Sequence, residues 1–155
     1  VEMGIAVVGH VGLHPQAVGA LGGLTVQGKS VETARKVVRE AMALQDAGVF
    51  AIIFEAVPAK LSAYVTQKLR VATISIGGGP GCSGQLLVTP DVLGMFDAFT
   101  PSFAKRYQNF NGLMKETFAR YAEEVRTGVF PGEEHSYKMA DEVLEAIEKE
   151  FGAAD

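Results

Sequence analysis

Short apolar runs separated by turn-forming residues predict several buried strands. Residues 5–8 form one such run, and residues 50–55 form a second run between Gly48 and Pro58. A continuous apolar run of this length is typical of a strand that is buried on both faces in a parallel sheet. Residues 71–76 are rich in β-branched side chains and predict a third strand.

Helical periodicity fills the intervals between these strands. From Ser30, which we expect to be an N-cap with Glu32 in the first turn, apolar positions recur every 3.6 residues until Gly48. A second helix is predicted over residues 59–69. The alternation of strand and helix favours parallel βαβ units with right-handed crossovers.

The second half of the chain is less regular. Residues 83–94 are ambiguous, because Pro90 would break a long helix, so Ser83 could cap one short helix and Pro90 could open another. Residues 96–100 predict a short fourth strand. An amphipathic helix that ends at Gly128 follows, and a last helix has an apolar stripe formed by Val143, Leu144, Ile147 and Phe151.

The expected fold class is therefore α/β, of the (β/α)8 TIM-barrel type. We expect residues 1–155 to form a single unit that supplies about the last four βα units of a barrel. The βα units would occupy residues 1–127, and a turn and a C-terminal helix would occupy residues 128–155. Half a barrel would expose a sheet edge and apolar surface, so a partner chain or a missing N-terminal half is expected to cover it.

Composition and charge narrow the function classes. The chain has 155 residues, of which 48% are hydrophobic and 21% are charged, with a formal net charge of -4, which indicates one soluble globular unit. An acidic balance with no cluster of Lys and Arg argues against nucleic acid as a partner. No apolar stretch approaches the roughly 20 residues of a membrane span, so no membrane partner is expected. A single cysteine, Cys82, excludes an intramolecular disulfide and suits a reducing compartment.

Glu55 is the strongest candidate for chemistry. It is the only charged residue of its predicted strand and stands at the C-terminal end, where ligands bind in open α/β sheets and in (β/α)8 barrels. A carboxylate at this position is a candidate general base. The alternatives are that Glu55 begins a solvated loop or pairs with a neighbouring Lys or Arg.

Other polar residues near the predicted strand ends carry weaker signals. His10 follows the first strand and could bind a substrate carbonyl or carboxylate, or be a structural histidine. Gly77–Gly79 could bring backbone N–H groups to an anion, although ordinary turn chemistry is favoured. We expect His14 on the surface of a loop, and Cys82 to be a small buried or loop residue.

Glu133, Glu134 and His135 are adjacent, but no second ligand cluster at metal-like spacing accompanies them. Nucleotide-binding patterns of the Walker and Rossmann types are missing. The candidate site residues therefore remain Glu55 and His10, with no metal ligand assigned in this chain.

Several motifs, in order along the chain, resemble those of the ketopantoate hydroxymethyltransferase family, and specifically its C-terminal half. They cover nearly all of the sequence between His10 and Ser136. The motifs are Gly9–Gln16, Gly22-Gly23 with Val26-Gln27-Gly28, Phe54–Pro58, Ile74–Gly79 and Pro131–Ser136.

This resemblance implies an aldol-type reaction of pantothenate biosynthesis. A hydroxymethyl group derived from methylene-tetrahydrofolate would be transferred to α-ketoisovalerate (3-methyl-2-oxobutanoate), an α-keto acid. Glu55 matches the family base in the Glu-x-Val-Pro pattern, and His10 matches a substrate-binding histidine. A magnesium ion on the keto acid would stabilise the enolate, with its ligands expected from the missing N-terminal half.

The resemblance also implies a (β/α)8 barrel in a homo-oligomer, commonly a decamer, or a complement to an N-terminal half. The expected location is cytoplasmic, or mitochondrial in a eukaryote. The chain departs from the family pattern at His14, at Ser75–Gly79 and at Pro90-Asp91. We therefore expect this chain alone to be inactive. A non-catalytic barrel half and another α-keto acid lyase of the phosphoenolpyruvate mutase superfamily are the alternative functions.

Overall fold

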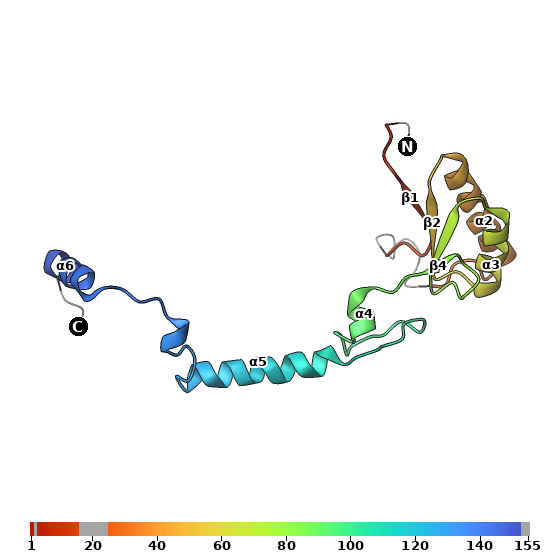
Figure 1. Ribbon diagram of the computed structural model, residues 1–155. Helices are drawn as coiled ribbons and strands as arrows, with labels where there is room; N and C mark the ends of the chain where they lie inside the picture. The colour runs from red at the N-terminus through yellow and green to blue at the C-terminus, as the bar shows by residue number, and fades with distance from the viewer. Residues whose placement is uncertain (2, 16–24, 153–155) are drawn as a thin grey trace. The chain divides into compact units, whose positions relative to one another are not determined.

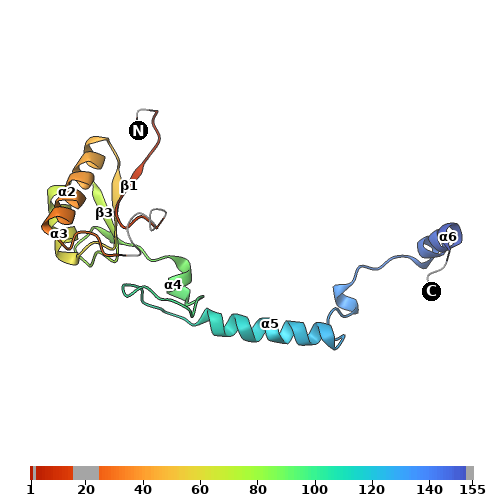
Figure 2. The same ribbon diagram turned by 180° about the vertical axis from the view of Figure 1, so that it is seen from behind.

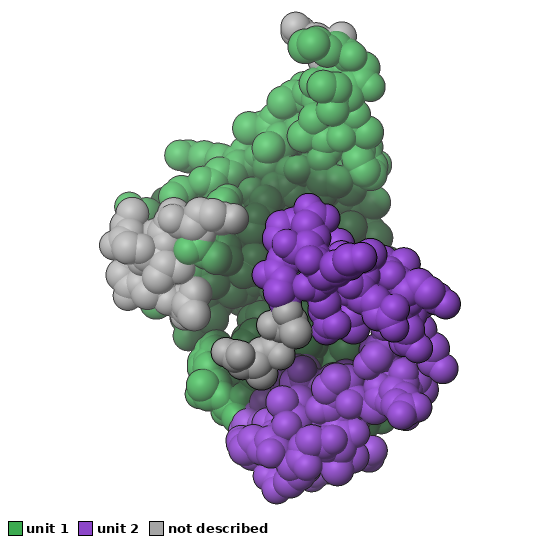
Figure 3. All heavy atoms as spheres, turned by 90° about the vertical axis from the view of Figure 1, so that its left-hand side faces the viewer, with its two compact units in different colours: residues 1–109 green, residues 110–155 purple. Residues whose placement is uncertain are grey.

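A computed structural model describes residues 1, 3–15 and 25–152 of the chain. The chain divides into two compact units, Val1–Asn109 and Phe110–Asp155, which are coloured separately in Figure 3. The first is called unit 1 and the second unit 2. The expectation that residues 1–155 complete one half of a barrel stays a prediction.

Unit 1 contains a parallel sheet whose strands follow one another in sequence order. The strands are β1 (Val8–Gly12), β2 (Ala51–Glu55), β3 (Ala72–Ile76) and β4 (Gly84–Gln85), in the order β1-β2-β3-β4 (Figure 1). Each neighbouring pair is parallel. The predicted α/β class with a parallel sheet is confirmed.

Two helices connect the first three strands and pack against the same face of the sheet. Helix α2 (Val31–Asp46) follows β1, and helix α3 (Ala59–Lys68) follows β2 (Figures 1 and 2). The predicted N-cap of α2 is confirmed, because the Ser30 hydroxyl accepts a hydrogen bond from the backbone N–H of Thr33 at 3.1 Å. Both helices begin and end within one residue or two of the expected positions.

The core of unit 1 lies between the sheet and these two helices. Its centre is formed by Val11, Val37, Ala41, Val49, Ile52, Phe54, Val57 and Val65, all buried. Side chains alternate between the two faces along a strand. Ile52 and Phe54 point into the core, so Ile53 and Glu55 point to the face away from the helices. The opposite face of β1 and β2 therefore carries His10, Ile53 and Glu55.

Two strand predictions are wrong. The first strand is Val8–Gly12 and not residues 5–8, and Ile5 is 61% exposed. The glycines that suggested a turn are needed within β1, because a Cβ on Gly9 would stand 2.8 Å from Cδ1 of Leu44 on α2. His10 consequently lies inside β1 and not in the loop after it.

The fourth strand is also elsewhere. Residues 96–100 form no strand, and the short strand β4 (Gly84–Gln85) pairs with β3 instead. Ser83 caps no helix, since it precedes β4, where its hydroxyl accepts a hydrogen bond from the backbone N–H of Thr73 at 3.2 Å. Pro90 does open a short helix, α4 (Thr89–Leu93), as one of the two alternatives stated.

Unit 2 consists of helix α5 (Phe110–Arg126), a 3-10 helix η2 (Glu133–His135) and helix α6 (Asp141–Phe151). The predicted helix before Gly128 and the predicted last helix are confirmed. Among the described residues, every helix is too short or too polar to cross a membrane.

Candidate active site

The strand register places His10 and Glu55 together. In the parallel pair of β1 and β2, His10 stands opposite Ile53, and Gly12 stands opposite Glu55. Residues two apart share a face of a sheet, so the side chains of His10 and Glu55 are diagonal neighbours. Nε2 of His10 lies 3.1 Å from Oε2 of Glu55.

Glu55 is largely shielded from solvent. It is the last residue of β2, and its side chain is 17% exposed, against 31% for His10. It does not begin a solvated loop. Among the ion pairs of the described residues, its partner is His10 and not Lys or Arg.

Backbone hydrogen bonds fix the tip of β2 from both sides. The N–H of Leu13 donates to the carbonyl of Glu55, and the N–H of Ala56 donates to the carbonyl of Ile76, both at 2.9 Å. Ala56 has a φ of 50°, in the left-handed region that non-glycine residues rarely adopt. The chain thus turns sharply directly after the carboxylate.

His14 completes a small cluster with His10 and Glu55. Its ring centroid lies 4.7 Å from that of His10, and its Nδ1–H donates to the carbonyl of Gly12 at 3.1 Å. As predicted, His14 lies in the loop after β1, but its side chain is half-buried and not fully on the surface. Gly12, with a φ of 103°, bends the chain at the end of β1 and allows this contact.

The charge of His10 reflects competing effects. Burial lowers its pKa from the ordinary value of 6.5, and His14 lowers it further. The Glu55 carboxylate acts in the opposite direction and raises it, but the pKa of His10 is lowered overall. Nε2 is buried and faces the Glu55 carboxylate, but it makes no well-aligned hydrogen bond with the described residues.

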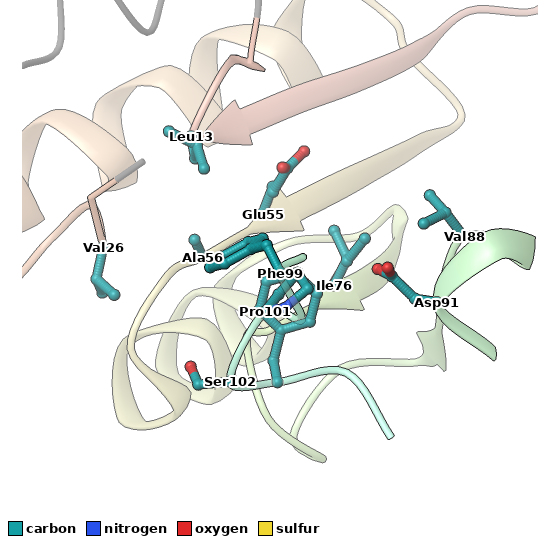
Figure 4. Close-up of a pocket in the computed structure, with 11 residues that line it drawn as sticks. Leu13, Val26, Glu55, Ala56, Ile76, Val88, Asp91, Phe99, Pro101 and Ser102 are labelled. Atoms are coloured by element: carbon teal, nitrogen blue, oxygen red, sulfur yellow. The ribbon is translucent and has the colours of Figure 1, made fainter. Parts of the chain in front are cut away.

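A pocket of about 250 Å³ opens beside Glu55, at the carboxyl ends of β2 and β3 (Figure 4). We call it the Glu55 pocket. Its lining is mainly apolar, with a second carboxylate from Asp91 on α4 and a hydroxyl from Ser102. The full lining is Leu13, Val26, Glu55, Ala56, Ile76, Val88, Asp91, Phe99, Pro101, Ser102 and Phe103.

Asp91 and Phe99 were not among the residues expected in the site. Phe99 falls in the segment that the apolar pattern assigned to a strand. The available signal for Asp91 was its place directly after Pro90, in the first turn of a helix that follows a strand. Both residues reach the pocket through the tertiary folding of residues 88–103, which no local sequence pattern predicts.

The glycine run after β3 packs closely against α3. A Cβ on Gly79 would collide with Cβ of Ala59, and one on Gly81 would stand 2.5 Å from Cβ of Ala63. The N–H of Gly78 donates to the hydroxyl of Ser75 at 2.8 Å. These contacts are typical of the turn and packing role that the sequence favoured.

The remaining candidates lie apart from the His10 and Glu55 pair. Cys82 is half-buried, and its Sγ accepts a hydrogen bond from the Thr66 hydroxyl at 3.6 Å. In η2, Nδ1 of His135 accepts a hydrogen bond from the backbone N–H of Gly132 at 3.1 Å. The motif residues Gln16, Gly22 and Gly23 fall outside the described residues.

Comparison with known proteins identifies the family. The model of the family described as ketopantoate hydroxymethyltransferase matches residues 1–133. The 3-methyl-2-oxobutanoate hydroxymethyltransferase of Carboxydothermus hydrogenoformans is 51% identical over 147 residues, which cover 95% of this chain and 53% of that protein.

Two further relatives of the same name show the same coverage. The protein of Enterococcus faecalis is 48% identical over 147 residues, covering 95% of this chain and 54% of that protein. The protein of Oleidesulfovibrio alaskensis is 45% identical over 155 residues, covering 100% of this chain and 54% of that protein. The chain therefore spans about half the length of the curated relatives that it matches. On this evidence the resemblance drawn from the motifs is confirmed, and the chain belongs to the ketopantoate hydroxymethyltransferase family.

Proposed function

We propose that this chain supplies the general base of a hydroxymethyl transfer from methylene-tetrahydrofolate to α-ketoisovalerate, which yields ketopantoate. The observation that supports this most is the position of Glu55: a shielded carboxylate at the tip of β2, 3.1 Å from His10 and lining the Glu55 pocket. A carboxylate in such a place can approach a carbon acid while bulk water is kept away.

The reaction begins with removal of a proton. The carboxylate of Glu55 takes the proton from carbon 3 of the keto acid, and the electrons of the broken C–H bond move to the ketone oxygen to form the enolate. His10 binds an oxygen of the keto acid through its buried Nε2, which has no well-aligned partner among the described residues.

The enolate carbon then forms a bond to the one-carbon unit that the folate supplies. Over the whole reaction, the two C–N bonds of the methylene bridge break, and the oxygen of one water molecule completes the CH₂OH group. The two hydrogens of that water end on the two nitrogens that held the bridge, so the folate leaves as tetrahydrofolate. The proton held by Glu55 ends on the new hydroxyl oxygen, which restores the carboxylate for the next cycle.

The family resemblance also implies a magnesium ion. In the described part of the chain, no group of three His, Cys, Asp or Glu side chains could hold one. We propose that its ligands come from the N-terminal half of the enzyme. Glu55 and His10 act on the keto acid and are not ligands of the metal. This chain alone is then expected to be inactive.

Proton exchange at carbon 3 of α-ketoisovalerate tests the base directly. The enzyme is assembled with its N-terminal half and magnesium, and loss of the carbon 3 proton signal in D₂O is followed by NMR without folate. Glu55→Gln should lower the exchange rate at least about 100-fold, in line with the usual contribution of a general base. The matched control is Glu116→Gln, which changes an exposed carboxylate on α5 and should leave exchange unchanged.

The outcome also separates the alternative functions. If Glu55→Gln exchanges as fast as the unchanged enzyme, Glu55 is not the base. A non-catalytic barrel half would show no exchange with either variant. Another α-keto acid lyase would process a different keto acid and give no ketopantoate when methylene-tetrahydrofolate is added.

A further inference from the structure

The charge distribution in the Glu55 pocket restricts what can bind there. Its two ionisable side chains, Glu55 and Asp91, are both acidic. In the part of the chain that the structure describes, no Lys, Arg or His lines this pocket. An anion would be repelled by both carboxylates, whereas a ring that carries N–H donors would find acceptors.

Asp91 is placed to accept such donors. It lies in the first turn of α4, half-buried, and Figure 4 shows its carboxylate oxygens directed toward Ile76. Among the described residues it has no ion pair and no side-chain hydrogen bond. Its acceptor atoms are therefore free for a ligand, and shielding by the pocket makes an unsatisfied carboxylate costly.

The remaining walls suit a flat ring. Ile76, Phe99 and Pro101 supply apolar and aromatic surface beside the two carboxylates (Figure 4). Phe103 also lines the pocket. Aromatic side chains bind flat heterocycles by stacking. The volume of about 250 Å³ leaves room for a bicyclic ring.

We propose that the Glu55 pocket binds the pteridine ring of the folate co-substrate, with Asp91 accepting hydrogen bonds from the ring N3–H and the adjacent 2-amino group. This inference rests on the proposed function. The keto acid, which is an anion, binds on the His10 side of Glu55. Glu55 then stands between the two substrates, where the enolate carbon and the one-carbon unit must meet.

Equilibrium binding of tetrahydrofolate tests this assignment without turnover. Isothermal titration calorimetry is performed on the enzyme assembled with its N-terminal half. Asp91→Asn should weaken tetrahydrofolate binding about tenfold or more, because the amide replaces one acceptor oxygen with a donor.

Two further variants make the result decisive. Asp46→Asn makes the same chemical change at an exposed position at the end of α2, and should leave tetrahydrofolate binding unchanged. Phe99→Ala removes an exposed ring from the pocket wall and should weaken tetrahydrofolate binding. Because Phe99 lies outside α4, this result does not depend on whether α4 keeps its structure in Asp91→Asn.

The assignment is overturned if Asp91→Asn and Phe99→Ala both bind tetrahydrofolate within twofold of the unchanged enzyme. It is also overturned if they weaken binding of the keto acid and spare tetrahydrofolate, or if the unchanged enzyme does not bind tetrahydrofolate. Failure of the proposed function is distinct, since it would appear as absence of proton exchange in the unchanged enzyme.

Discussion

Burial is the largest single influence on the pKa of His10. Its pKa is lowered by burial first and by His14 second, although Glu55 raises it. In the unfolded chain this pKa returns to about 6.5. At pH values between the pKa of His10 in the folded chain and about 6.5, the unfolded state binds more protons than the folded state. The free energy of unfolding therefore increases as the pH rises through this range and decreases as the pH falls.

Replacing His14 tests how this neighbour affects the pKa of His10. His14→Thr removes a neighbouring positive charge when both rings are protonated, and it admits water to the His10 ring. Both changes favour the imidazolium, so the pKa of His10 should rise. The measurement is the pH titration of the His10 ring protons by NMR.

His135→Gln serves as the control, because His135 lies in unit 2, where its ring contacts Phe130. It should leave the titration of His10 unchanged. A pKa of His10 that stays constant or falls in His14→Thr would show that the two rings do not interact as their 4.7 Å separation indicates.

At the scale of elements, the end of β1 and the tip of β2 depend on one glycine. Gly12 has a φ of 103°, and a Cβ there would collide with the carbonyl oxygen of Glu55 and stand 2.7 Å from Cγ2 of Val57. The close approach allows the N–H of Leu13 to reach the same carbonyl. The glycine thus holds the tip of β2 against β1.

Gly12→Ala should therefore destabilise unit 1 and displace Glu55. A strained φ and a backbone collision together should cost about 2 kcal/mol or more of the free energy of unfolding. Urea unfolding measures this cost, and the proton exchange rate of the assembled enzyme should fall with it.

Gly4→Ala provides the comparison, since Gly4 also has a positive φ, of 74°, but no atom lies within 4 Å of the position that a Cβ would occupy there. Only the backbone strain of about 1–2 kcal/mol applies at this residue. Equal destabilisation by the two substitutions would mean that the contact with Glu55 is not what requires glycine at position 12.

Elements with strong local signals were predictable from the sequence. Helix α2 has a cap at Ser30 and a clear period, and β2 is a continuous apolar run before Pro58. The error at β1 arose because Gly9 and Gly12 suggest a turn in sequence, whereas they serve contacts with Leu44 and Glu55. Such contacts join residues that are far apart along the chain.

The site was predictable to a similar extent. Glu55 could be predicted from its place at the end of a strand, and His10 from the glycine-rich residues around it in the sequence. The contact of His14 with His10 could not be predicted, because it depends on the bend of the chain at Gly12. Asp91 and Phe99 reach the pocket through tertiary folding of residues 88–103. The roles of these residues stay proposals.

At the scale of the whole molecule, the helices of unit 2 have apolar side chains that the described residues of this unit leave exposed. Within this unit, the large apolar side chains that are exposed on α5 and α6 are Phe110, Leu113, Phe118, Tyr121, Val125, Val143, Leu144, Ile147 and Phe151. Exposed apolar surface on a helix face is characteristic of interaction sites. It agrees with the expectation, drawn from the family resemblance, of a homo-oligomer or of a complement to an N-terminal half.

The isolated chain should consequently self-associate. Sedimentation equilibrium should give masses above 16.4 kDa that increase with concentration. Replacing Leu144 and Ile147 by Glu should reduce this association, because charge would enter the apolar stripe of α6.

The control changes Glu145 to Gln on the same helix, outside the apolar stripe, and should preserve association. A chain that stays monomeric at all concentrations would contradict the expected role of these faces. Association that persists in the double Glu variant would assign it to α5 or to unit 1.

The two hydrogen bonds that hold the tip of β2 have a consequence for how the site moves. The amide of Leu13 is bonded to Glu55 and that of Ala56 to Ile76, so neither hydrogen can exchange with solvent until three strand ends separate. Deuterium should therefore enter these two amides slowly and together. Opening of this end of the sheet is then a cooperative event, and the backbone that carries the Glu55 side chain stays in place until it occurs.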